Sequence, residues 1–149
     1  VHPDFHKELH TKKKEYKEHV DKIVKHLADH GHEKLSRVTG GKNKPTGMGE
    51  HPDNQVNRAR AVQRAKNLHH VHVGTKASPL GKNGTGSEVI HYGHVKSKAT
   101  GKTTYHVLGH TGHEAGANSN MDHAMSVGSI TARAGSIIKE AIEVLGTLL

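Results

Sequence analysis

The sequence predicts an α+β fold in which N-terminal helices and a C-terminal helix flank an antiparallel sheet of three to four strands. Three observations predict it. Near the N-terminus, apolar residues recur at helical spacing; in the middle of the chain they alternate with polar residues; near the C-terminus the helical spacing returns. The chain has 149 residues, which is the size of one domain, so we expect residues 1–149 to fold as a single unit.

The first part of the chain, residues 1–35, is predicted to be one long helix from about His2 to His32. Leu9, Tyr16 and Ile23 are seven residues apart and form one apolar stripe, while lysines cover the other faces. Gly31 is available for a left-handed cap at the end of this helix. Residues 36–55 contain four Gly and two Pro, and this composition predicts a loop.

The next elements, in residues 56–149, are predicted to be a short helix and then the sheet. Asp53 precedes the short helix and is a residue type that caps helices. Alternating segments begin near Leu68, Glu88 and Thr103 and have the pattern of half-buried strands. The sequence at 98–102 is typical of a hairpin turn, and short connections of this kind favour antiparallel pairing.

The final helix is predicted from apolar residues at helical spacing between about Met121 and Leu145. Gly128 and Gly135 fall inside this pattern. Glycine in a helix interior costs roughly 1 kcal/mol relative to alanine, so we expect a kink or a close packing contact at these positions.

Composition limits the chemistry of the chain. Lys and Arg number 22 against 14 Asp and Glu, which gives a net charge of +8 and a pI near 9.7, so a polyanion such as nucleic acid is the expected partner. The chain has no Cys, which excludes disulfides, thiolate zinc fingers and cysteine nucleophiles. No apolar run approaches the ~20 residues of a membrane helix, and no signal-peptide pattern is present, so we expect a cytoplasmic protein without a membrane partner.

Histidine is the most informative residue type, with 17 copies. The predicted strands carry His69, His70, His72, His91, His94 and His106. Imidazole titrates near neutral pH and suits acid–base catalysis, and it is also a common zinc ligand. A third interpretation is a biased composition with solvated side chains, and this is what we expect for the seven histidines among the first 32 residues.

A basic cluster accompanies these histidines. Its cations can neutralise phosphate groups or stabilise the charge on a pentacovalent phosphorus. The candidate RNA- and phosphate-binding residues in this cluster are Arg58, Arg60, Arg64, Lys66, Lys96 and Lys98. Acidic residues are scarce here, because Glu88 is the only one between Gly74 and Tyr105.

From the first strand onward, the chain resembles the YafO branch of the RelE-like bacterial toxins. The resemblance rests on "NLHHVHVG" at residues 67–74 and on the strand and following stretch at residues 103–130. In that branch a stretch with the order H-x-A-x-N-x-M-H precedes the closing helix. Here the corresponding residues are His113, Ala115 or Ala117, Asn118, Asn120, Met121 and His123.

The resemblance implies a RelE-like fold and an endoribonuclease, or mRNA interferase, that needs no metal or other cofactor. It also implies that mRNA on the ribosome is the substrate and that a cognate antitoxin or immunity protein is a partner. Such cleavage uses the 2′-hydroxyl of the RNA as the nucleophile, with a base, an acid and cations around the phosphate. The candidate catalytic residues are His113 and His123, with His72, His91, His106 and Tyr105 as further candidates. Asn118 and Asn120 of the matching stretch are further candidates for RNA binding.

Two other functions fit the sequence. The first is a zinc-binding protein or zinc-dependent hydrolase built on the strand histidines. The second is a nucleic-acid-binding module without catalytic activity, for which the basic charge is sufficient.

Overall fold

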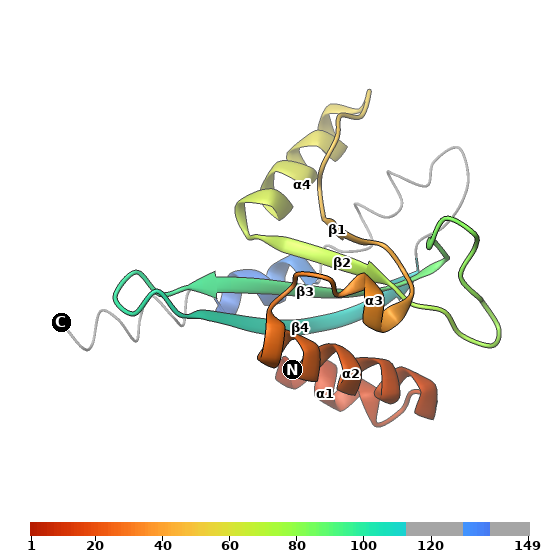
Figure 1. Ribbon diagram of the computed structural model, residues 1–149. Helices are drawn as coiled ribbons and strands as arrows, with labels where there is room; N and C mark the ends of the chain where they lie inside the picture. Colours follow the sequence, from red (N-terminus) through yellow and green to blue (C-terminus); the bar gives the residue numbers. More distant parts are fainter. Residues whose placement is uncertain (113–129, 138–149) are drawn as a thin grey trace.

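The computed structural model describes residues 1–112 and 130–137 of the chain (Figure 1). The named elements follow one another along the sequence as α1 (Pro3–Leu9), α2 (Lys14–His30), α3 (Ser36–Thr39), β1 (Asn43–Pro45), α4 (Asn54–Ala65), β2 (Leu68–His72), β3 (Glu88–Lys96) and β4 (Thr103–Gly112). Residues 130–137 are also helical. The α+β class predicted from the sequence is therefore confirmed.

The four strands form one antiparallel sheet in the order β1-β2-β3-β4. β3 and β4 pair along their whole lengths, with an irregularity between His91 and Tyr92. The hairpin between them is closed by two hydrogen bonds, from Ser97 N–H to the Lys102 carbonyl (2.9 Å) and from Gly101 N–H to the Ser97 carbonyl (2.8 Å). The turn and the antiparallel pairing predicted from the sequence are thus present.

One face of the sheet is covered by α1 and α2 (Figure 1). The apolar core on this side joins side chains from the two helices to side chains from β2, β3 and β4. Its buried members are Phe5, Leu9, Val20, Ile23, Leu27, Leu35, Val71, Val73, Ile90, Tyr92 and Val107. The stripe expected from the seven-residue spacing is the surface that packs on the sheet.

The helix expected from His2 to His32 is divided into two in the structure. The N–H of Thr11 donates to the Glu8 carbonyl (3.1 Å), and its hydroxyl donates to the same carbonyl (2.8 Å), so the chain leaves the helix after Leu9. Three consecutive lysines follow at 12–14 and repel one another. α2 ends before Gly31 as predicted, and the Gly31 N–H donates to the Leu27 carbonyl (3.0 Å). The left-handed helical cap expected at Gly31 is not formed, because its positive φ of 68° is combined with a ψ of −157°.

The opposite face of the sheet carries a second apolar cluster with the helix at residues 130–137. Leu68 and Leu108 pack there against Ile130 and Ala134. Gly109 permits the close approach, because a Cβ at this position would lie 2.3 Å from Ile130 Cδ1. Arg133 pairs with Glu8 of α1 and donates to the Leu108 carbonyl (2.8 Å), which ties the helix to the N-terminal layer.

The Gly- and Pro-containing segment at residues 36–55 was expected to be a loop, and the structure adds two short elements to it, α3 and β1. The cap predicted for the helix that follows is confirmed, because the Asp53 carboxylate accepts from the N–H groups of Gln55 and Val56. α4 and the loop before it stand away from the rest of the fold (Figure 1).

The final helix predicted from Met121 to Leu145 lies only in part within the described residues, which include 130–137 of it. Close packing at Gly135 agrees with the expectation from its sequence position, because a Cβ there would come 2.7 Å from Lys66 Nζ. Gly128 lies outside the described residues. Among the helices that the structure describes, none has both the length and the apolar character needed to cross a membrane.

The connection from α3 to β1 passes so close to β2 that it requires glycine. A Cβ on Gly41 would lie 2.0 Å from the His72 carbonyl oxygen, which is backbone and cannot move aside without disturbing the ladder. We expect Gly41→Ala to lower the free energy of unfolding in urea by about 1–3 kcal/mol. Gly81→Ala is the matched control, because its Cβ would meet only Thr85 O at 3.4 Å and should cost about 0.5 kcal/mol or less. Equal stability of the two variants would contradict this packing.

Candidate active site

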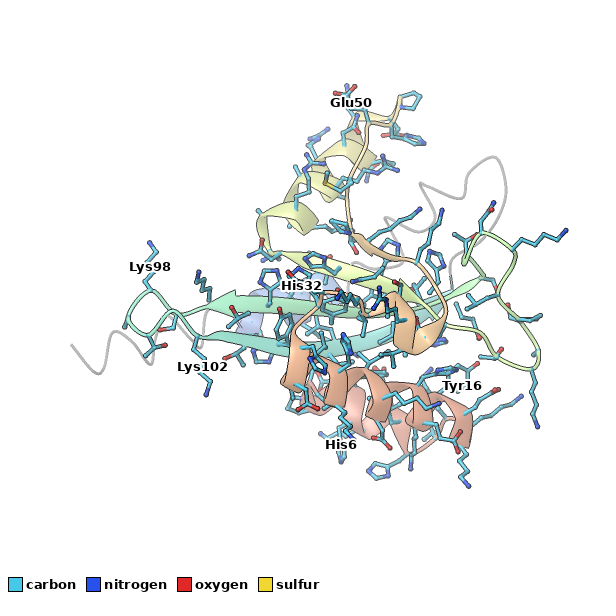
Figure 2. All side chains as sticks on the ribbon, viewed as in Figure 1. His6, Tyr16, His32, Glu50, Lys98 and Lys102 are labelled. Carbon is cyan, nitrogen blue, oxygen red and sulfur yellow. The ribbon has the colours of Figure 1, made fainter. Side chains whose placement is uncertain are left out.

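Three imidazoles and two phenols gather on the face of the sheet that the helices cover, next to the apolar core that includes Tyr92. We call them the histidine–tyrosine cluster: His32, His69, Tyr92, His94 and Tyr105. The strand register brings four of them together, because His69 pairs with Tyr92 and His94 pairs with Tyr105. The turn after α2 supplies His32, which lies above the sheet (Figure 2). Tyr92 is fully buried, and the other four side chains are partly exposed.

The rings of the cluster lie in mutual contact. The centroids of the three imidazoles form a triangle with sides of 5.2 Å (His69–His94), 5.3 Å (His32–His69) and 5.4 Å (His32–His94). His32 stacks on His94 with 9° between the ring planes, and His69 stacks on Tyr92 with 11° at 5.3 Å. A substrate group that reaches one imidazole is therefore within reach of the other two.

Tyr105 is hydrogen-bonded to His32. Its hydroxyl oxygen lies 2.8 Å from His32 Nδ1 and also accepts from the His32 backbone N–H at 3.3 Å. A phenol proton donated to Nδ1 leaves Nε2 as the protonated nitrogen of a neutral His32. Gly31 makes this contact possible, because a Cβ there would lie 2.9 Å from the Tyr105 oxygen.

Asn43 of β1 fastens His32 to the sheet. Its side-chain oxygen accepts from the Tyr92 hydroxyl (2.7 Å), and its side-chain NH₂ donates to the His32 carbonyl (3.2 Å). One amide thus joins the turn after α2, the edge strand and the central strand. The buried Tyr92 hydroxyl is satisfied by the same residue that positions the imidazole.

The environment of the cluster favours neutral imidazoles. Burial, together with the neighbouring His94 and His32, lowers the pKa of His69 from its ordinary value near 6.5 to about 4. Burial also lowers the pKa of His94, with a contribution from His32. Burial raises the pKa of the Tyr92 phenol. At neutral pH the His69 and His94 rings can therefore accept a proton.

The opposite face of the sheet carries other histidines that the sequence singled out. His70, His72 and His91 are buried there, with 7%, 3% and 0% exposure. His70 Nδ1 contacts Thr46 Oγ1 (2.9 Å), and His91 Nε2 contacts Thr111 Oγ1 (2.7 Å). His106 lies on the same face. The sheet itself separates these four imidazoles from the histidine–tyrosine cluster.

The candidate cations are spread over several elements. On α4, Arg58 and Arg64 are exposed and Arg64 donates to the Gly47 carbonyl, whereas Arg60 is only 8% exposed. Lys66 follows α4 and approaches Gly135. Lys96 lies two residues after His94 on β3 and shares its face. Lys98 extends from the β3–β4 hairpin (Figure 2).

Several candidates from the sequence lie outside the described residues: His113, Asn118, Asn120 and His123. Their assignment stays a prediction. Tyr105 was among the predicted catalytic residues, and the structure places it in the histidine–tyrosine cluster.

Sequence reasoning missed the contribution of His32, which it placed among the solvated histidines of the N-terminal region. It placed His69 and His94 on strands without choosing them. One signal could have separated His69 from its neighbours. Side chains alternate along a strand, so His69 lies on one face of the sheet and His70 and His72 lie on the other. The position of His32 depends on the turn at Gly31 and on Asn43, and no local pattern encodes it.

A metal site was the alternative reading of the histidines. In the portion of the chain for which the structure gives side chains, no three His, Asp or Glu are grouped so that they could hold a metal ion.

Comparison of the chain with protein-family models, with curated proteins and with solved structures finds no match. The resemblance to RelE/YafO-like toxins stays a prediction that rests on the residues quoted for it.

The lowered pKa of His69 makes stability depend on pH. The unfolded chain binds more protons than the folded one between pH 4 and 6.5, so the free energy of unfolding should fall as the pH drops through this window. His69→Gln should reduce this loss in urea titrations at pH 7 and pH 4.5. His6→Gln is the control, because His6 is exposed on α1 and should retain the wild-type dependence. Identical pH dependence in both variants would contradict the burial of His69.

Proposed function

We propose that the protein is an endoribonuclease that cleaves RNA by acid–base catalysis at the histidine–tyrosine cluster. The observation that carries the proposal is the contact of three imidazoles and a phenol, partly exposed, on one face of a cationic sheet. Imidazole and phenol are sufficient to move the protons of the reaction, so the proposal includes no cofactor.

The reaction follows from where the protons lie. The neutral ring of His69 or His94 takes the proton of the RNA 2′-hydroxyl while that oxygen attacks the adjacent phosphorus. The bond from phosphorus to the 5′-oxygen breaks, and the leaving oxygen takes a proton from Nε2 of His32. Tyr105 replaces that proton by passing its own to Nδ1 of His32, 2.8 Å away. The products are a 2′,3′-cyclic phosphate and a 5′-hydroxyl, and exchange with water restores both groups.

The charge of this half of the chain supports an RNA substrate. Residues 54–112 contain nine Lys and Arg against one carboxylate, Glu88. That carboxylate accepts from the Tyr16 hydroxyl (2.7 Å) at the far end of β3, and this hydrogen bond, with burial, raises the pKa of Tyr16 to about 12. Phosphate near the cluster therefore meets few acids, and Lys96 is the cation that shares the face of His94.

A bound phosphate also improves the catalytic groups. A pKa near 4 makes His69 a weak base, and an adjacent phosphate anion raises the imidazole pKa toward the pH of the reaction. The negative charge of the bound substrate thus offsets the lowering of the pKa that the neighbouring imidazoles cause.

The biological setting is proposed from the resemblance to RelE/YafO-like toxins. In this setting the substrate is mRNA on the ribosome, the protein acts in the cytoplasm to inhibit translation, and an antitoxin or immunity protein holds it inactive. A second candidate is an RNA-binding module without catalytic activity, which the acid-free stretch from 54 to 87 favours.

Variants on the two faces of the sheet test which histidines act. We expect His69→Gln to reduce the rate of cleavage of a 5′-labelled RNA by about 10²–10⁴-fold, the usual contribution of a general base. His72→Gln on the opposite face and His6→Gln on α1 should retain activity, with folding checked by circular dichroism. Loss of activity in His72→Gln but not in His69→Gln would move the site to the opposite face of the sheet. Loss of activity in His123→Gln but not in His69→Gln would instead favour the catalytic role predicted for His123 from the sequence. RNA binding without any product in the wild type would support the binding module instead.

The pH dependence of cleavage gives an independent test. If the base has the lowered pKa of His69, the acid limb of kcat/KM should fall near pH 4, and the acid limb of kcat should lie at higher pH because bound phosphate raises that pKa. Initial rates on a dinucleotide between pH 3.5 and 8 measure both limbs. A kcat/KM limb near pH 6.5 would show that an ordinary, unperturbed histidine is the base.

A further inference from the structure

A groove of about 390 Å³ begins at the histidine–tyrosine cluster and runs between α2 and β4. Tyr105 belongs to both the cluster and the groove, because its hydroxyl contacts His32 and its side chain lines the groove. The volume lies within the ~300–1,000 Å³ of small-molecule sites. The groove is therefore large enough for a nucleoside, and it shares Tyr105 with the groups proposed to act on the phosphate.

The helix side of the groove is apolar. Val24, Leu27 and Ala28 of α2 line it, and Val107 of β4 lies opposite. Val24 is 37% exposed, and Val1, which also lines the groove, is 47% exposed. They are two of the four large apolar residues that are exposed in the described part of the chain. The other two, Met48 and Val62, do not line the groove.

The strand side of the groove is polar. Lys102, Thr103 and Thr104 line it, and no carboxylate is among the lining residues. Figure 2 shows Lys102 at the hairpin that joins β3 to β4. β4 is an edge strand, and its Val107 carbonyl points outward, since it accepts from the His2 N–H (2.8 Å). Backbone groups alternate along a strand, so those of Thr103 and Tyr105 are expected to face the groove as well.

We propose that this groove is a nucleoside-binding subsite that holds one nucleoside next to the scissile phosphate. The base lies on the apolar surface of α2, the strand edge offers hydrogen bonds to the base, and Lys102 attracts the phosphate. The proposal rests on the RNA-cleaving function proposed above, and it assigns the chemistry that would select the substrate. An apolar wall with one cation and no acid fits a nucleotide better than a basic peptide.

Binding of nucleotides tests the subsite without catalysis. Uridine 3′-monophosphate and adenosine 3′-monophosphate are titrated into the ¹⁵N-labelled protein, with inorganic phosphate in parallel. We expect the nucleotides to shift the amide signals of Val24, Ala28 and Thr104, and phosphate alone to shift only those near Lys102 and Tyr105. If nucleotides and phosphate shift the same signals, or neither shifts any, the subsite is wrong.

A substitution that fills the groove with a larger side chain gives a second test of the nucleoside subsite. Ala28→Leu, on the exposed side of α2, should raise KM for a dinucleotide at least 10-fold and leave kcat within about twofold. Ala61→Leu on α4 is the matched control and should behave as wild type, because Ala61 is an exposed helical alanine outside the groove. Wild-type KM in Ala28→Leu, with RNA cleavage intact, would overturn the subsite and leave the proposed function standing. If the wild type cleaves no RNA, the proposed function fails, and the nucleotide titration still decides whether the groove binds nucleosides.

Discussion

The mutual contact of three imidazoles is the constraint on which the proposed chemistry depends. Like-charged rings at 5.2–5.4 Å cannot all be protonated without repulsion, and burial opposes the charge of His69 and His94. The free protein therefore keeps proton acceptors beside one another on a cationic surface. A phosphate relieves the constraint, because its negative charge allows one ring to hold a proton. In the proposed reaction, the same side chains contribute both to the affinity for RNA and to proton transfer.

The fold separates this cluster from a second group of histidines by the thickness of the sheet. β2 carries His69 toward the helices and His70 and His72 toward the other face, so adjacent residues serve different surroundings. The buried histidines on the far face contact Thr46 and Thr111, whereas Tyr105 of the cluster lines the groove beside β4. The imidazoles of the cluster are partly exposed, and His70, His72 and His91 on the other face are buried.

Much of the fold could be predicted because its signals are local: the Asp53 cap, the glycine that ends α2 and the hairpin at 98–102 each lie within a few residues of the structure they cause. The break between α1 and α2 was missed, since the apolar spacing of seven continues across it. The cluster was missed because His32 and His69 are 37 positions apart and meet only through the turn at Gly31 and the side chain of Asn43. The predicted pair His113 and His123 lies outside the described residues.

The most direct test of the account is an NMR titration of the imidazole signals with His69 assigned through the His69→Gln spectrum. The account predicts that His69 titrates below pH 5 in the free protein and moves upward when uridine 3′-monophosphate is bound. A free-protein titration near pH 6.5 that nucleotide leaves unchanged would show that the rings are solvated and independent. That result would contradict the cluster as the site of catalysis.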